Sequence, residues 1–200
     1  MEKGLTFAYE MGDNIYINLT NRCSNACTFC VRNGKDSYYG NKLWLQREPT
    51  CGEVLAAVPQ KPYKEAVFCG FGEPTERVGV LVEVAAALKA RGFKIRINTN
   101  GQGNLINGRD ITADLAGVVD YVNVSMNAPS AEEYQAVCKS RFGERAFTAM
   151  LDFAALCAER GIKTVFSVVD CIGRQKVEEC ARIAAARNIP LRVRPMIYDS

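Results

Sequence analysis

Histidine is absent from this chain of 200 residues. Its absence excludes Ser-His-Asp and Cys-His catalytic arrangements within the chain and removes the commonest zinc ligand. Long apolar runs are also missing, because none reaches the roughly 18 residues that a membrane-spanning helix needs. The net charge of +3 is too small to indicate a polyanionic partner. Any chemistry of this chain must therefore depend on side chains other than histidine.

The N-terminal segment, residues 1–14, carries neither a long apolar core nor a small-residue cleavage site. A secretory signal is therefore not predicted, and we expect a cytoplasmic protein that has no membrane partner. In the cytosol the nine cysteines are expected to be reduced thiols and metal ligands rather than a disulfide framework.

Short apolar runs alternate with helical patterns along the whole chain. Runs rich in Val, Ile, Phe, Tyr and Thr predict strands at 14–20, 65–70, 94–101, 121–128, 163–170 and 190–197. Helices are predicted at 50–58, 78–92, 108–117, 130–140, 145–161 and 174–188. This alternation is typical of an α/β fold built from βαβ units, in which the strands are parallel.

The length of the chain limits the kind of parallel sheet. A complete eight-unit barrel takes about 250 residues, so six units predict a partial, open (βα)6 TIM-like barrel. A flat doubly wound sheet is the alternative. No linker rich in Pro, Gly and Ser interrupts the pattern, and we expect a single domain over residues 1–200. In both folds, the ligand site lies at the carboxyl ends of the strands.

Three cysteines, Cys23, Cys27 and Cys30, follow the first predicted strand directly. Structural zinc sites usually use four protein ligands, and neither a histidine nor a second CxxC pair is available here. Thiolates also hold iron–sulfur clusters, and a cubane with three cysteine ligands keeps one iron open to a small molecule. The spacing predicts a three-thiolate site, and a zinc-stabilised α/β binding module stays open as an alternative.

The C-x3-C-x2-C spacing, with the aromatic Phe29 before the third cysteine, resembles the radical S-adenosylmethionine (SAM) superfamily. The resemblance implies a [4Fe-4S] cluster on the three cysteines, with the amino and carboxylate groups of SAM on the open iron. It also implies reductive cleavage of SAM to a 5′-deoxyadenosyl radical, which abstracts hydrogen from a substrate. The whole chain, including the stretch YINLTNRCSNACTFCVRNG, resembles one branch, the radical SAM family associated with TatD-type nucleases.

The sequence Gly-Phe-Gly-Glu-Pro ends the second predicted strand. Gly70 and Gly72 allow a close approach of the backbone to a ligand, and Glu73 offers a carboxylate. The stretch resembles the Gly-Gly-Glu-Pro motif of the superfamily, which holds the amino group of SAM, but Phe71 is inserted between the glycines. A tight turn between strand and helix is the alternative interpretation.

Polar residues end the next two predicted strands as well. Asn98 and Asn100 belong to INTNG, and alternation along the fourth strand sends Ser125 and Asn127 to one face. The resemblance implies that these side chains and Phe29 contact SAM, with Ser125 and Asn127 at its ribose and carboxylate. An unliganded Asn-Gly turn and a hydrogen-bonded layer inside the barrel are the alternatives.

The resemblance also implies a partner, an electron donor of the flavodoxin or ferredoxin type. The substrate is unassigned and could be a macromolecule, because an open barrel has a wide mouth; an activating-type enzyme that acts on a protein partner is therefore an alternative. Nucleic acid is not favoured, since no aromatic and basic stripe is evident. No catalytic side chain is singled out, and Asp170, Arg194 and the six other cysteines have no assigned role.

Overall fold

Seven strands form one sheet in the computed structural model, which describes residues 3–197. The strands lie in chain order from β1 to β7, and every neighbouring pair is parallel except β1 with β2. The strands are β1 Ala8–Met11, β2 Asn14–Ile17, β3 Glu65–Phe68, β4 Lys94–Thr99, β5 Tyr121–Ser125, β6 Lys163–Val169 and β7 Leu191–Arg194. The edge strands β1 and β7 do not pair, so the predicted open, partial barrel is confirmed.

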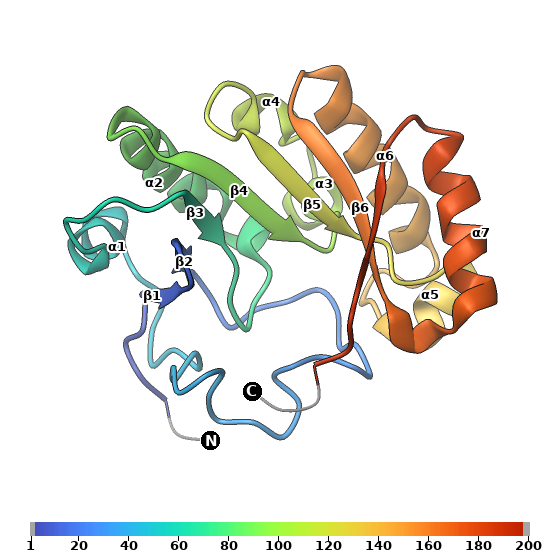
Figure 1. The fold of residues 1–200 in the computed structure, drawn as a ribbon, viewed down its shortest axis with the longest axis horizontal. Coiled ribbons are helices and arrows are strands. Elements are labelled where there is room, and N and C mark those ends of the chain that lie inside the picture. The colour runs from blue at the N-terminus through green and yellow to red at the C-terminus, as the bar shows by residue number, and fades with distance from the viewer. Residues whose placement is uncertain (1–2, 198–200) are drawn as a thin grey trace.

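Helices cover the outer face of the sheet, and the long loop after β2 crosses its open side (Figure 1). The α-helices are α1 Cys51–Ala57, α2 Val78–Ala90, α3 Gly103–Asn107, α4 Thr112–Leu115, α5 Ala131–Cys138, α6 Arg145–Glu159 and α7 Arg174–Ala185. There are two short 3-10 helices: η1 Pro74–Arg77 follows β3 after residues 69–73, and η2 Asp170–Ile172 directly follows β6. The predicted helix at 108–117 is shorter than expected, and α3 was not predicted.

The antiparallel strand β1 is an addition to the six parallel strands that the sequence predicts. Met11 pairs with Asn14, so Gly12 and Asp13 form a two-residue hairpin loop. Gly12 has a positive φ of 56°, which the first residue of such a turn requires. The Gly-Asp pair between two apolar runs is a recognised hairpin signal, and it could have located β1.

The register of the strands decides which side chains face the interior of the barrel. Asn98 on β4 lies opposite Asn123 on β5, and Ser125 lies opposite Ser167 on β6. Neighbouring positions in a parallel pair share a face, so these polar side chains form one interior set. The alternate residues, Val122 among them, belong to the hydrophobic core between sheet and helices. The predicted alternation along β5 is therefore confirmed.

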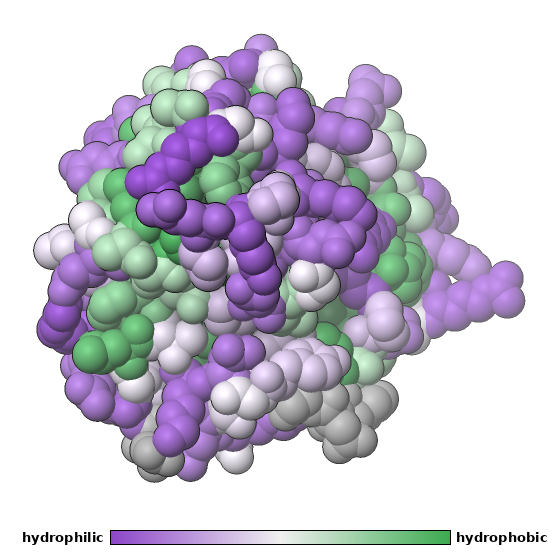
Figure 2. Space-filling model, turned by 60° about the vertical axis from the view of Figure 1, so that its left-hand side comes forward, coloured by the Kyte–Doolittle hydropathy of each residue, from purple (hydrophilic) through white to green (hydrophobic). Residues whose placement is uncertain are grey.

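The surface over the α1 and α2 side carries mostly hydrophilic residues, and hydrophobic ones show only in separate small areas (Figure 2). Within residues 3–197, no helix has the length and apolar character that crossing a membrane requires.

Candidate cofactor site

The three cysteines lie at the carboxyl ends of the strands, on the loop that follows β2. Cys23, Cys27 and Cys30 are partly buried and line a cavity of about 220 Å³. The same cavity is lined by all the other residues that the sequence singled out: Phe29, Gly70, Gly72, Glu73, Asn98, Asn100, Ser125 and Asn127. Residues from four separate stretches of the chain therefore meet in one place.

Burial favours the protonated form of the thiols in this loop. Burial raises the pKa of Cys23 to about 12 and also raises the pKa of Cys30. A hydrogen bond with the neighbouring Cys138 thiol raises the pKa of Cys27. Within residues 3–197, no three Cys, Asp or Glu side chains are gathered closely enough to hold a metal ion. Cluster ligation by these thiols stays a prediction, and it requires their deprotonation.

The cysteine loop is docked on the C-terminal end of α5. The backbone N–H of Ala26 donates to the carbonyl of Cys138 at 3.0 Å, and that of Thr28 donates to Val137 at 2.9 Å. The last carbonyls of a helix have no partner inside the helix, so the loop satisfies groups that are otherwise free. This contact places Cys27 beside Cys138 and holds the cysteine loop against the C-terminal end of α5.

A buried polar network supports the loop from inside the barrel. Gln102 Nε2 donates to Asn25 Oδ1 at 2.7 Å and to the hydroxyl of Tyr134 at 2.9 Å. Asn25 Nδ2 also donates to Tyr134, at 3.2 Å, and the Ser140 hydroxyl donates to Gln102 Oε1 at 2.9 Å. All four side chains are at most 5% exposed. Satisfied buried networks fix one arrangement of the groups they join, so this network holds the loop between Cys23 and Cys27.

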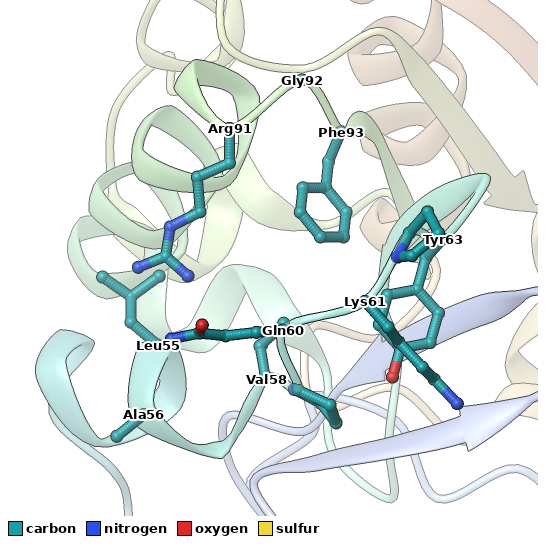
Figure 3. A pocket seen from close by; sticks show the side chains of 11 residues that line it. Leu55, Ala56, Val58, Gln60, Lys61, Tyr63, Arg91, Gly92 and Phe93 are labelled. Atoms are coloured by element: carbon teal, nitrogen blue, oxygen red, sulfur yellow. The ribbon is translucent and has the colours of Figure 1, made fainter.

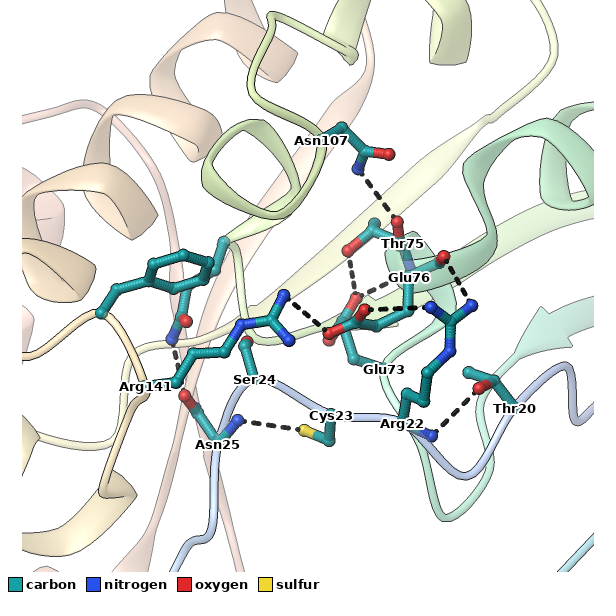
Figure 4. A network of polar contacts seen from close by, with 12 residues as sticks. Thr20, Arg22, Cys23, Ser24, Asn25, Glu73, Thr75, Glu76, Asn107 and Arg141 are labelled. Atoms are coloured by element: carbon teal, nitrogen blue, oxygen red, sulfur yellow. Dashed lines mark hydrogen bonds and ion pairs between the residues drawn. The ribbon is translucent and has the colours of Figure 1, made fainter.

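A second network holds the outer side of the loop (Figure 4). The buried carboxylate of Glu76, on η1, lies between Arg22, at 3.8 Å, and Arg141, at 3.3 Å. Arg22 also pairs with Glu48 at 2.8 Å. Arg22 immediately precedes Cys23. These ion pairs therefore anchor the first cysteine to η1, the 3-10 helix that follows β3.

Arg32 anchors the other end of the cysteine stretch. Its guanidinium donates to the backbone carbonyls of Asn21, Phe71 and Asn25 at 3.1, 2.9 and 3.2 Å, respectively. It also lies 5.8 Å from the centre of the Trp44 ring. Arg32 therefore ties together the loop and the Gly-Phe-Gly-Glu-Pro turn through backbone contacts.

Glu73 is almost completely buried and accepts four hydrogen bonds. Its Oε1 accepts from the N–H and hydroxyl of Thr75 and from the hydroxyl of Thr99, at 3.1, 2.7 and 2.7 Å. Its Oε2 accepts from the N–H of Asn100 at 2.8 Å. Burial raises the pKa of this carboxyl, and the four donors act against that shift. Glu73 therefore joins the ends of β3 and β4, and Oε2 retains one accepting position on the cavity side.

The two glycines are needed for contacts within the protein. A Cβ on Gly70 would lie 2.1 Å from Asn18 Oδ1, and one on Gly72 would lie 2.2 Å from the carbonyl oxygen of Thr20. The expected close approach is thus to the end of β2, and contact of these glycines with SAM stays a prediction. The inserted Phe71 is 3% exposed and packs on the long loop, with its ring 5.2 Å from Trp44.

Asn100 has hydrogen-bond partners within the protein, and its predicted contact with SAM stays a prediction. Its Nδ2 donates to the Ser24 hydroxyl at 2.8 Å, and its Oδ1 accepts from the N–H of Gln102 at 2.9 Å. The side chain therefore joins β4 to the cysteine loop. Ser24, Asn25 and Gln102 carry this support, and no sequence pattern identified them, because their partners are distant in the chain.

Several polar atoms of the cavity wall are buried without a partner. They are Oδ1 of Asn98, Asn123 and Asn127 and Nε of Arg194. Buried polar groups in proteins are nearly always paired, so an unpaired set around one cavity indicates a ligand. Asn123 and Arg194 were not among the predicted contacts. Strand alternation places both on the interior face, which is the signal that could have selected them.

A second cavity, of about 420 Å³, adjoins the first and shares Phe29, Asn127 and Met196 with it. Its wall includes Val137 from α5 and Ile172 from η2, together with the ion-paired Glu133 and Lys176. The two cavities together extend from the cysteines to α5.

The sequence matches the Radical SAM superfamily over residues 17–186. Because this match covers most of the chain, the protein belongs to that superfamily. Its members are enzymes that use a [4Fe-4S] cluster and SAM, so both predicted cofactors and the predicted enzyme class are confirmed. No curated protein matches the sequence.

Solved structures of radical SAM proteins share the fold. A TYW1 structure with a lysine-pyruvate adduct bound has a TM-score of 0.67 at 14% identity and covers 93% of this chain. A radical SAM methyltransferase from Sphaerobacter thermophilus has a TM-score of 0.63 at 18% identity over 94% of this chain. SuiB from Streptococcus suis has a TM-score of 0.63 at 15% identity over 90% of this chain. This chain spans 65%, 68% and 38%, respectively, of those three proteins.

Proposed function

We propose that this enzyme holds a [4Fe-4S] cluster on Cys23, Cys27 and Cys30 and cleaves SAM reductively at that cluster. When bound, the cluster supplies the electron for this cleavage, which gives a 5′-deoxyadenosyl radical for hydrogen abstraction from a substrate. The observation that carries the proposal is the meeting of the three cysteines with the Gly70–Glu73 turn at one cavity. Superfamily membership supports it independently.

The residues of the cavity suit the parts of SAM. Glu73 Oε2 has an accepting position for the cofactor's ammonium, and the unpartnered amide oxygens of Asn98 and Asn127 can accept from hydroxyls. Phe29 and Met196 lead from this cavity into the second one, where Val137 and Ile172 offer apolar contacts. We assign that second cavity to the flat adenine, because apolar side chains and a ring edge suit an aromatic base.

Partner and substrate follow as further parts of the proposal. A flavodoxin or ferredoxin is the proposed electron donor, since cluster potentials span about −700 to +450 mV and only the low end suits this reduction. The proposed substrate enters at the open side of the barrel, which admits a macromolecule as well as a small molecule. Membership of the branch associated with TatD-type nucleases rests on the resemblance of the whole chain, including the stretch around the cysteines.

Anaerobic reconstitution with iron and sulfide tests the proposal. We expect iron and sulfide in the protein, a brown chromophore, and 5′-deoxyadenosine after addition of SAM and a low-potential reductant. A single bound zinc without sulfide would favour a zinc-stabilised binding module instead. A loaded cluster that never yields 5′-deoxyadenosine would contradict the proposed cleavage.

A further inference from the structure

The cavity beside the cysteines contains two charged side chains among its described lining residues, Glu73 and Arg194. Glu73 is already bonded to four donors from the protein. Arg96, which lies on the same interior face, is paired with Glu65 at 2.9 Å. Arg192 shares that face but is exposed and does not line the cavity. Arg194 is therefore the remaining charge of the cavity wall, and within residues 3–197 its side chain has no hydrogen bond or ion pair.

Arg194 is held where it cannot be solvated fully. It ends β7 opposite Val169, and its Nε is buried without a partner. It lines the same cavity as Cys69, which follows β3, so the edge strand β7 brings this side chain to the interior of the barrel. Burial lowers the pKa of Arg194, which reflects the cost of this position.

The nearest carboxylate along the adjoining strand does not compensate Arg194. Asp170 follows β6, and its Oδ1 accepts from the N–H of Met196 at 2.9 Å. No acidic side chain is among the groups that influence the Arg194 charge. Arg194 is partly buried, and a cation that is withdrawn from water without a partner is costly, so a chain that keeps one in a cavity gains from an anion that binds there.

We propose that Arg194 is an anion-binding residue of this cavity and receives a carboxylate or phosphate group of a molecule bound inside the barrel. The planar guanidinium donates to both groups in a two-pronged geometry. Asn98 and Asn123 lie in the same cavity and are available to bind polar groups beside the anion. The inference rests on the proposed function in one respect, that this molecule is bound beside SAM. If the anion belongs to the substrate, the substrate is an anionic compound. The other source of the anion is the carboxylate of SAM.

The test compares Arg194→Gln and Arg194→Lys with Arg192→Gln, which removes the same charge from an exposed position of the same strand. Inorganic phosphate and succinate are titrated separately into the cluster-free and the SAM-saturated, cluster-loaded protein by calorimetry at constant ionic strength. SAM affinity of the cluster-loaded variants is measured in parallel. Thermal unfolding checks that each variant is folded, and Arg194→Lys keeps the charge if Arg194→Gln does not fold.

We expect at least one of the two anions to bind wild type and Arg192→Gln equally. Binding to Arg194→Gln should be about tenfold weaker or more, the range for a charged hydrogen bond. The anion affinity of Arg194→Lys should lie between those of wild type and Arg194→Gln, because lysine keeps the charge but lacks the two-pronged donor geometry of the guanidinium. Loss of phosphate or succinate binding with SAM already present assigns the anion to a second molecule, whereas a tenfold loss of SAM affinity assigns it to the cofactor.

Two results would overturn the assignment of Arg194. One is wild-type affinity of Arg194→Gln for phosphate, succinate and SAM; the other is a wild type that binds neither anion and loses no SAM affinity on substitution. The proposed function is judged separately, on cluster content and on 5′-deoxyadenosine formed by wild type. Anion binding to the cluster-free protein keeps the two outcomes distinguishable.

Discussion

The two ends of the barrel both carry a cavity, but their polar groups differ. At the amino ends of the strands lies a cleft of about 940 Å³ between the last turns of α1 and α2, lined by Leu55, Val58, Tyr63, Arg91 and Phe93 among others (Figure 3). At the carboxyl ends lies the cysteine cavity, of about 220 Å³. The larger cavity is therefore at the end where no cysteine of the triad and no family motif lies.

Two polar side chains of the larger cleft share one partner. Lys61 Nζ and the Tyr63 hydroxyl both donate to Glu10, each at 2.7 Å. Tyr63 also stacks on Phe93, with ring centres 6.1 Å apart. Within residues 3–197, no side chain of this cleft has a buried polar atom without a partner. Unpaired polar atoms distinguish the cysteine cavity, and they are a better sign of ligand binding here than volume.

Among substitutions at the two ends of the barrel, Cys27→Ala is expected to have the largest effect on cluster binding. Loss of one thiolate should abolish the brown chromophore and the bound iron after reconstitution, because three thiolates are the proposed ligands. Absorbance and iron analysis measure this loss. The thermal unfolding of the cluster-free protein should change little, since the fold is built on the core below the loop.

Cys51→Ala is the matched control for the cysteine substitution. Cys51 is also partly buried, but it begins α1 and does not line the cysteine cavity. It should keep full iron content. An unchanged chromophore in Cys27→Ala would contradict the proposed ligand set. The cysteine end of the barrel would then no longer be distinguished by cluster binding.

A glycine substitution tests how tightly the carboxyl end is packed. In Gly72→Ala the new methyl group would lie 2.2 Å from the carbonyl oxygen of Thr20, a backbone atom that cannot rotate away. We expect a loss of about 1–3 kcal/mol in the free energy of unfolding, as for other overpacked sites, together with poorer cluster loading. Urea unfolding and iron content provide the two measurements.

Gly79→Ala provides the comparison for Gly72. Gly79 lies in α2 and a Cβ there meets nothing within 4 Å, so alanine should be neutral or stabilising because of its higher helix propensity. Equal losses in both variants would mean that packing against Thr20 is not what requires a glycine at 72.

Much of this end of the barrel could be predicted because its information is local. Alternation along β5 places Asn123 and Ser125 on one face, and the neighbouring strands repeat the pattern. The cysteine spacing and the Gly-Phe-Gly-Glu-Pro stretch are contiguous motifs that mark loops at strand ends. These signals predicted the partial barrel and the residues that now line one cavity.

The supporting contacts could not be predicted because their partners are far apart in the chain. Asn25 meets Gln102 and Tyr134, which follow it by 77 and 109 residues. Each is an ordinary polar residue in its own segment, and only the closed fold makes the set complete. The close approach of Gly72 to the backbone of Thr20 could not be predicted either, because the two residues are far apart in the chain.

Tyr134→Phe should destabilise the cysteine end no more than Gly72→Ala does. The change removes the acceptor for the amides of Asn25 and Gln102 and leaves both buried. An unsatisfied buried donor costs about 1–3 kcal/mol, with Gln102 still bonded to Asn25 at 2.7 Å. We expect a moderate fall in unfolding free energy and a faster loss of iron to a chelator.

The chelator rate decides what Tyr134 does. If the network positions the cysteine loop, iron should leave Tyr134→Phe several times faster than it leaves a core variant of equal stability, such as Cys157→Ala on α6. If iron leaves Tyr134→Phe and an equally destabilised Cys157→Ala at the same rate, the Tyr134 network stabilises the fold in general and does not position the cysteine loop.

The smallest effect is expected at the opposite end, from Tyr63→Phe. The hydroxyl that is lost donates to Glu10, a carboxylate that keeps Lys61 as its partner and stays open to water. The ring and its stacking on Phe93 are retained. Unfolding free energy should therefore stay within about 0.5 kcal/mol of wild type, as for most surface substitutions, and iron content should be unchanged. A loss of 5′-deoxyadenosine formation in this variant would show that the larger cleft takes part in catalysis. Buried polar atoms without a partner would then not be what marks the functional cavity of this protein.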